Sequence, residues 1–154
     1  MVLTEKQKQL IQKIGIANEK HGMQPAAARI IGLLYVSDKP ELTFEEIGEA
    51  LHISKSATSN ALNLLMQTDR MEYTTVSGDR KRYFRLKISN WKDGFTKEME
   101  SLTNFSQLIM EVLAIRTSET PEFNKSLAEL KDFLIFINQE LPLLMEKWKK
   151  SRES

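Results

Sequence analysis

The sequence predicts a mainly α-helical fold that carries one small β-hairpin, and three observations support this prediction. Apolar residues recur every three or four positions along most of the chain, which is the period of one face of an α-helix. That period breaks between residues 71 and 88, where β-branched and aromatic residues flank a Ser77-Gly78-Asp79 turn. Near the C-terminus the period tightens into a heptad pattern, which is typical of a helix that packs on a partner helix.

Two helices are expected before residue 40. The first covers about residues 3–21 and ends at Gly22, and its apolar seam consists of Leu3, Leu10, Ile14 and Ala17. Pro25 suits the first turn of the second helix, which continues to about Ser37. Small side chains in the second helix would let a neighbouring helix approach closely: Ala26, Ala27, Ala28 and Gly32.

Two shorter helices follow, and only His52 and Ile53 separate them. Thr43 and Glu46 have the spacing of a capping box at the start of the first helix. Ser54 can cap the second helix, which runs to about Thr68. Two helices joined by so short a turn form a helix-turn-helix, and a hairpin directly after them completes the winged-helix arrangement.

The second helix of this pair is rich in Ser, Thr and Asn, which are mediocre helix formers because their side chains compete for backbone hydrogen bonds. In a helix-turn-helix the second helix enters the major groove of DNA, where short polar side chains can bond to base edges and Lys can reach guanine or a phosphate. The expected DNA-contacting residues are Lys55, Ser56, Thr58, Ser59, Asn60 and Asn63.

The hairpin is basic although the net charge of the 154-residue chain is only +1. Its segment "RKRYFRLK" holds five cations and no carboxylate, whereas residues 42–51 hold three glutamates and no cation. We expect Arg80, Lys81 and Arg82 to contact the DNA backbone or the adjacent minor groove. Because neighbours alternate along a strand, Arg80 and Arg82 should share one side and Lys81 should lie on the other.

Two long helices are expected after the hairpin. Apolar residues recur at helical spacing from Trp91 to Val112, and a heptad seam runs from Leu127 to Trp148 after a break at residues 118–121. Pro142 interrupts this seam, so we expect a kink or a split of the last helix there.

Catalysis, metal binding and membrane insertion all lack support in the sequence. The absence of cysteine excludes disulfides, thiolate zinc sites and cysteine nucleophiles. The two histidines, His21 and His52, have no catalytic motif around them, and no glycine-rich phosphate loop or G-x-S-x-G elbow is present. No apolar run reaches the ~18 residues of a membrane span, and residues 1–20 lack the apolar h-region of a signal peptide. We expect a cytoplasmic protein that is not an enzyme and that binds no cofactor or metal.

Two other interpretations stay open. First, four aromatic residues could gather into a small-molecule pocket: Tyr35, Trp91, Phe95 and Phe105. Such a pocket would attract a quaternary ammonium group by cation–π contact. Aromatic residues at helical spacing are, however, usually part of the core. The winged helix could instead serve protein contact or complex assembly without a specific DNA target. A polar second helix and a basic wing favour DNA over that alternative.

The chain resembles the MarR superfamily of winged-helix regulators, and more closely its GbsR-like branch. The resemblance covers about residues 20–88 and is carried by "ARIIGLLYVS", "LTFEEIGEAL", "SKSATSNALNLL" and "SGDRKRYF". There are two departures. Asp69-Arg70-Met71 replaces the Gly-hydrophobic pair that many members have after the recognition helix, and Lys81 stands where the Asp-x-Arg wing signature has Arg.

This resemblance implies a homodimer whose N- and C-terminal helices intertwine, with each protomer presenting one winged helix to half of a pseudo-palindromic operator. It divides the chain into an N-terminal dimerisation helix (1–22), a winged helix-turn-helix domain (23–89) and a C-terminal helical dimerisation region (90–154). The expected function is that of a sequence-specific, repressor-like transcriptional regulator. Modulation by a small effector stays open, and the GbsR resemblance makes a choline-like ligand conceivable.

Overall fold

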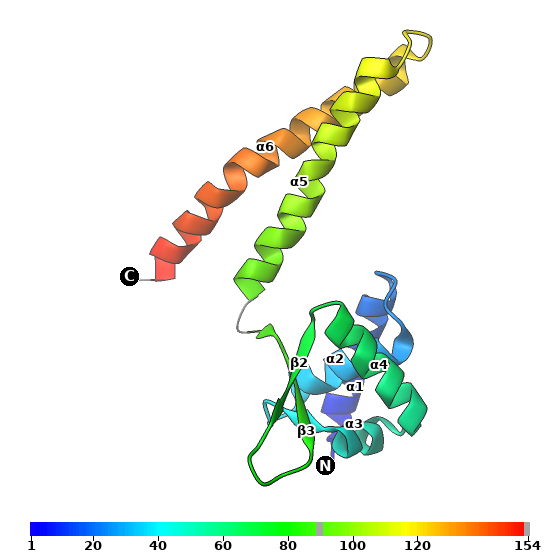
Figure 1. Cartoon of the computed structure of the whole chain (residues 1–154), viewed down its shortest axis with the longest axis vertical. Coiled ribbons are helices and arrows are strands. Elements are labelled where there is room, and N and C mark those ends of the chain that lie inside the picture. The colour runs from blue at the N-terminus through cyan, green and yellow to red at the C-terminus, as the bar shows by residue number, and fades with distance from the viewer. Residues whose placement is uncertain (89–90, 153–154) are drawn as a thin grey trace. The chain divides into compact units, whose positions relative to one another are not determined.

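The computed structural model describes residues 1–88 and 91–152 and separates into two compact units, Met1–Ser89 and Asn90–Ser154 (Figure 1). The first unit contains four helices and a small sheet, and the second is a pair of long helices. The mainly helical fold with a β wing therefore agrees with the sequence prediction. The expected domain boundary between residues 89 and 90 lies outside the described residues. No helix within the described ranges combines the length and apolar character of a membrane span.

The first unit begins with α1 (Glu5–Glu19) packed against α2 (Pro25–Val36). Thr4 and Gln7 cap α1 reciprocally, because the Gln7 amide donates to the Thr4 hydroxyl and the Thr4 amide donates to the Gln7 side chain. At Gly32 the helices approach so closely that a Cβ would lie 2.9 Å from the carbonyl oxygen of Ile11. The close approach expected from the small residues of α2 is confirmed, whereas a dimerisation role of α1 stays a prediction.

The helix-turn-helix consists of α3 (Phe44–Leu51) and α4 (Lys55–Gln67). Both expected caps are present: Thr43 and Glu46 form a capping box on α3, and the Ser54 hydroxyl accepts a 3.2 Å hydrogen bond from the Ala57 amide. Between the helices, His52 adopts a left-handed conformation with φ of 52°. This conformation ends α3, and the chain reaches the N-cap of α4, Ser54, after one further residue, Ile53.

The C-terminal end of α4 shows how Asp69 can stand where the resemblance implies Gly. The Arg70 amide donates to the Leu65 carbonyl and the Asp69 amide donates to the Met66 carbonyl, which is the bonding of a Schellman motif. This motif requires a left-handed residue, and Asp69 supplies it with φ of 58°, at the position where the resemblance implies Gly in many members. Asp69 also forms an ion pair with Lys87 on the far side of the hairpin.

The sheet has three antiparallel strands in the order β1-β3-β2, made of β1 (Leu42–Thr43), β2 (Met71–Thr75) and β3 (Arg82–Leu86). The sequence did not indicate β1. Tyr73 faces Phe84 across the β2–β3 ladder. Because β3 begins at Arg82, Arg80 and Lys81 belong to the preceding turn. The expected alternation of Arg80, Lys81 and Arg82 along one strand is therefore wrong.

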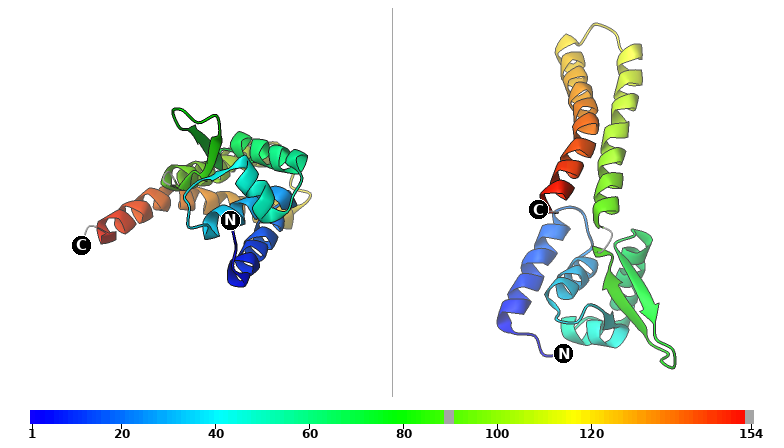
Figure 2. Two further views of the ribbon diagram at one scale, coloured as in Figure 1. Left: turned by 90° about the horizontal axis from the view of Figure 1, so that it is seen from below. Right: turned by 90° about the vertical axis from the view of Figure 1, so that its left-hand side faces the viewer.

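The core of the first unit gathers apolar side chains from every one of its helices and from the sheet. Its fully buried members include Ile30 and Leu33 of α2, Ile47 of α3 and Leu65 of α4. Phe84 anchors the hairpin to this core from β3. The hairpin itself projects from the unit (Figure 2), so its turn is accessible while its base is held.

The second unit consists of α5 (Trp91–Ile115) and α6 (Pro121–Arg152), which run side by side as a hairpin (Figure 2). Pro142 lies inside α6 without dividing it, so of the expected kink or split the split is wrong, and the kink stays a prediction. Between the helices, the Thr103 hydroxyl donates to the Asn138 side chain at 3.1 Å, and Trp91 meets Trp148 edge-on with ring centroids 5.4 Å apart.

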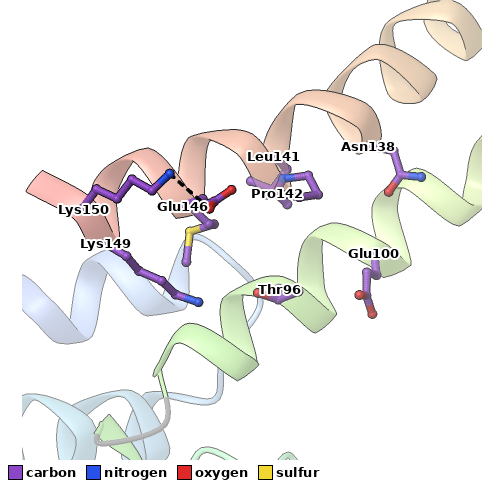
Figure 3. Close-up of a pocket in the computed structure, with 9 residues that line it drawn as sticks. Thr96, Glu100, Asn138, Leu141, Pro142, Glu146, Lys149 and Lys150 are labelled. Carbon is purple, nitrogen blue, oxygen red and sulfur yellow. Dashed lines mark ion pairs between the residues drawn. The ribbon is translucent and has the colours of Figure 1, made fainter.

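A cavity of about 620 Å³ lies between α5 and α6 around Pro142 (Figure 3). Thr96 and Glu100 line it from α5, and Lys150 pairs with Glu146 at its α6 side. Although α6 is 32 residues long, none of its described residues is buried. The unit therefore leaves much of its apolar surface open.

Candidate nucleic-acid interface

The outer face of α4 presents polar side chains to solvent, as the sequence predicts. The exposed members of the expected set are Lys55, Ser56, Ser59, Asn60 and Asn63. Their opposite face is anchored, since Ala61, Leu62 and Leu65 are at most 2% exposed. The Ser56 hydroxyl lies 3.0 Å from that of the N-cap Ser54, so it can bond there and still face outward. DNA contact by these five side chains stays a prediction.

Thr58 is a correction to the expected set. Its side chain is fully buried and its hydroxyl donates to the Ser54 carbonyl at 3.0 Å. It packs against α3 so closely that a Cβ on Gly48 would lie 3.3 Å from the Thr58 hydroxyl. The spacing of Thr58, Ala61, Leu62 and Leu65 already follows the helical period of a buried face, and this signal could have placed Thr58 inside.

The turn of the wing is held by one carboxylate. Asp79 accepts a 2.9 Å hydrogen bond from the Lys81 amide and a 2.7 Å hydrogen bond from the Tyr83 hydroxyl, while Gly78 supplies a φ of 86°. These bonds, the Tyr83 bond first, lower the pKa of Asp79, and the same carboxylate raises the pKa of Tyr83. The backbone that carries Arg80 and Lys81 is thereby fixed on both sides.

The five cations of the hairpin fall into two groups. Arg85 pairs with Glu72 at 2.7 Å, and Lys87 pairs with Asp69, so these two serve the internal structure. Arg80, Lys81 and Arg82 form no ion pair with any residue in the described ranges. These three are the cations that the sequence singled out for DNA contact.

Arg82 is held by an aromatic ring that the sequence analysis did not single out. Its guanidinium carbon lies 4.7 Å from the ring centroid of Tyr73, which is cation–π geometry. Tyr73 faces Phe84 across the ladder, so Arg82 is its diagonal neighbour on the same side of the sheet. The sequence locates the turn of the hairpin at Gly78 but does not fix the register of its strands, so it did not indicate this pair.

The polar helix and the basic wing meet in a shared depression of about 330 Å³. We call it the α4–wing hollow. Ser59 and Asn63 line it from α4, and Arg80, Lys81 and Arg82 line it from the wing. Phe44, Leu62, Met66 and Phe84 form its floor, and Glu45 completes the lining. Residues that the sequence placed in two separate motifs are thus brought to one surface.

The four aromatic residues proposed for an effector pocket are all partly exposed. Tyr35 belongs to α2 in the first unit, and its exposed fraction is 55%. Trp91, Phe95 and Phe105 belong to α5 in the second unit. Trp91 packs on Trp148, and the Lys92 ammonium lies 4.9 Å from the Trp148 ring centroid, so this aromatic pair already attracts one cation. A ligand at these residues stays a prediction.

Two family models match the chain in succession. A model of the MarR family matches residues 21–82, and a model described as an MmpR5-like MarR family transcriptional regulator matches residues 89–151. The first match covers the helix-turn-helix and most of the wing, including Arg80 and Arg82. The second covers α5 and nearly all of α6. Together the two matches account for most of the chain.

The chain is similar to two HTH-type transcriptional regulators over most of its length. The HTH-type transcriptional regulator MmpR5 of Mycobacterium tuberculosis is 26% identical over 129 residues, which are 84% of this chain and 78% of the relative. The HTH-type transcriptional repressor OpcR of Bacillus subtilis is 26% identical over 148 residues, covering 86% of this chain and 79% of the relative.

A solved structure agrees with the fold. A crystal structure of a transcriptional regulator superimposes with a TM-score of 0.72 at 23% identity, covering 94% of this chain and 99% of the other. The matched models lie on the same elements that build the helix-turn-helix, the wing and the long helices. The chain belongs to the MarR family of DNA-binding, winged helix-turn-helix transcriptional regulators, a family of non-enzymatic proteins.

Proposed function

We propose that this chain acts as a homodimer that binds a pseudo-palindromic operator, with α4 in the major groove and the wing on the adjacent backbone or minor groove. The α4–wing hollow is the observation that carries this proposal. It combines hydroxyl and amide groups that can bond to base edges with three cations that form no ion pair in the described structure. Ser59 and Asn63 would read bases, and Arg80, Lys81 and Arg82 would contact phosphate and sugar.

The helical hairpin of the second unit supports the homodimer. Large apolar side chains are exposed along both of its helices, among them Phe105, Leu108, Phe133 and Phe136. Exposed apolar surface of this extent usually marks an interface. Within the chain, α5 already packs on the heptad seam at Trp148, so a second copy of the hairpin would cover the apolar side chains that stay exposed, and two-fold symmetry would bring the same face of each copy together.

We further propose that the protein is a repressor of the GbsR-like branch. The four motifs between residues 20 and 88 support the branch, and the description of OpcR as a repressor supports the direction of regulation. A protein that acts on chromosomal DNA works in the cytoplasm, and we place this chain there.

An effector would act on the distance between the two recognition helices. A ligand shifts a dimer between two geometries only through its different affinities for them. Trp91 and Phe95, near the start of α5, are the first candidates for such contacts, together with Phe105. A quaternary ammonium group suits their electron-rich ring faces.

The experiment that tests the proposed function is a selection from random duplex DNA with the purified full chain at near-physiological salt. We expect an inverted repeat whose half-sites lie about 34 Å apart, one turn of DNA, because two-fold symmetry sets that spacing. Recovery of a single half-site would contradict the dimeric arrangement. Recovery of no motif by a folded dimer, with and without candidate quaternary ammonium ligands, would contradict sequence-specific regulation and favour a protein-binding winged helix.

A further inference from the structure

Glu45 occupies a distinctive place at the candidate interface. It lies in the first turn of α3, exposed, and lines the α4–wing hollow. It also lines a depression of about 230 Å³ beside Lys55 at the helix-turn-helix turn, and one of about 540 Å³ behind the wing beside Lys81. Glu49 lines these two depressions as well, so the α4–wing hollow is what distinguishes Glu45 from it.

The Glu45 side chain takes no part in the hydrogen bonds and ion pairs that hold α3 within the described residues, and its structural contribution is that of a carboxylate near the positive end of the helix dipole. The capping box of α3 uses the next residue, Glu46, which bonds to the Thr43 amide and pairs with Lys39 at 2.5 Å. Glu45 forms no ion pair with another described residue. It is also the sole carboxylate among the described residues that line the α4–wing hollow, where Arg80, Lys81 and Arg82 carry the positive charge.

We infer that Glu45 is a selectivity residue that weakens binding to DNA of any sequence. This inference rests on the proposed DNA-binding function. In a helix-turn-helix the first helix crosses the DNA backbone, so a carboxylate at the start of α3 is brought toward phosphates. Its charge repels them and offsets part of the attraction of the wing cations. The complex then depends more strongly on the contacts that α4 makes with bases.

The test compares Glu45→Gln with Glu49→Gln in the full chain. Both substitutions remove one negative charge from the exposed side of α3, but Glu49 does not line the α4–wing hollow. Binding to a random-sequence duplex of fixed length is measured by fluorescence anisotropy over a series of salt concentrations. Circular dichroism and urea unfolding check that both variants keep the parent fold.

We expect Glu45→Gln to tighten binding to random-sequence DNA by about three- to ten-fold at low salt, with less effect at high salt because counterions screen the repulsion. Glu49→Gln should change the affinity by less than about two-fold, because its charge lies one helical turn farther along α3. Glu45→Asp retains the charge and should bind like the parent.

Three results would overturn the inference. Equal tightening by the two Gln variants would mean that only the net charge matters. Unchanged or weaker binding of Glu45→Gln to random-sequence DNA would show that the Glu45 carboxylate does not repel DNA. Loss of affinity confined to one selected sequence would instead make Glu45 a base-reading residue, since a carboxylate can accept from the cytosine amino group. If the parent chain binds no DNA at all, it is the proposed function that fails.

Discussion

The Tyr83 hydroxyl donates a 2.7 Å hydrogen bond to Asp79, and this bond ties the turn of the wing to strand β3. The other carboxylate oxygen of Asp79 accepts from the Lys81 amide. The side chain of Asp79 therefore holds the backbone around Arg80 and Lys81 at two points, the Lys81 amide and the Tyr83 hydroxyl. The chain has Lys81 where the family signature has Arg, and the Tyr83–Asp79 bond fixes the turn without an arginine at that position.

This bond predicts a flat pH response of the wing across the neutral range. Because the pKa of Asp79 is lowered, its contribution is complete above the ordinary carboxyl pKa and is lost only as the pH falls through the lowered value. The raised pKa of Tyr83 keeps its hydroxyl protonated below about pH 10. The NMR shift of the Lys81 amide should stay constant between about pH 5 and pH 9. In Tyr83→Phe, the low-pH midpoint of that shift should rise, and an unchanged midpoint would show that Asp79 is held by other groups.

Ser59 and Arg80 should affect DNA binding in different ways. Ser59→Ala should cost about 1–3 kcal/mol at one base position and leave random-sequence binding unchanged, because a hydroxyl that bonds to a base edge discriminates sequence. Arg80→Ala should weaken all sequences alike and reduce the log–log salt slope by about 0.9, the contribution of one phosphate contact. Anisotropy titrations on the selected operator and its single-base variants measure both effects. The reverse pattern would exchange the two roles without removing DNA binding.

The elements predicted correctly are those whose signals are local in the chain. The caps at Thr43 and Ser54 depend on residues within one helical turn, and the hairpin depends on Gly78 and its neighbours. Strand β1 escaped notice because two residues carry no period, and it exists only through pairing of Leu42 with Phe84, far along the chain. Pro142 remains within α6 because one proline removes only one backbone donor from a long helix.

The DNA-facing residues of α4 could be predicted from the sequence wherever the pattern of polar and apolar residues separates the outer face of the helix from its buried face. Polarity alone placed Thr58 outside, whereas its hydroxyl is satisfied by the Ser54 carbonyl and so tolerates burial. Arg82 and Tyr73 come together only through the register of the hairpin, which depends on where β3 begins. Side chains that act through a partner on another element are the ones that a single sequence leaves undetermined.

Burial of Thr58 predicts a stability effect without a direct effect on DNA recognition. Thr58→Val keeps the shape and loses the hydroxyl, which should lower the free energy of unfolding by about 0.5–1.5 kcal/mol. The loss stays modest because the Ser54 carbonyl still accepts from the Thr58 amide at 2.9 Å. Urea unfolding measures this change, and operator affinity under folding conditions should match the parent. A large loss of affinity in a stable variant would return Thr58 to the DNA-binding set.

The contact between α1 and α2 predicts contrasting effects of two glycine substitutions. In Gly32→Ala the new methyl group would lie 2.9 Å from the Ile11 carbonyl oxygen, so the helices must separate at a cost of about 1–3 kcal/mol. In Gly15→Ala the nearest atom is the Arg29 Cγ at 3.4 Å, and the gain in helix propensity should make this variant neutral or up to about 1 kcal/mol more stable. Thermal unfolding compares the two, and equal melting temperatures would contradict the close packing at Gly32.

The exposed aromatic residues of α6 predict how the dimer can be broken. Phe136 is 54% exposed, and if a second copy covers it, Phe136→Glu places a charge in an apolar interface. Sedimentation equilibrium should then show a shift from dimer toward monomer by at least about ten-fold in the dissociation constant, equivalent to about 1.4 kcal/mol. Gln139→Glu adds the same charge one helical turn farther along α6, at a position that is already polar, and should weaken the dimer less because no aromatic side chain is removed. The affinity for the operator should fall as the dimer dissociates, because a monomer contacts one half-site instead of two linked half-sites. A Phe136→Glu variant that stays dimeric would place the interface on other faces of α5 and α6, and equal dissociation of both variants would reduce the effect to charge alone.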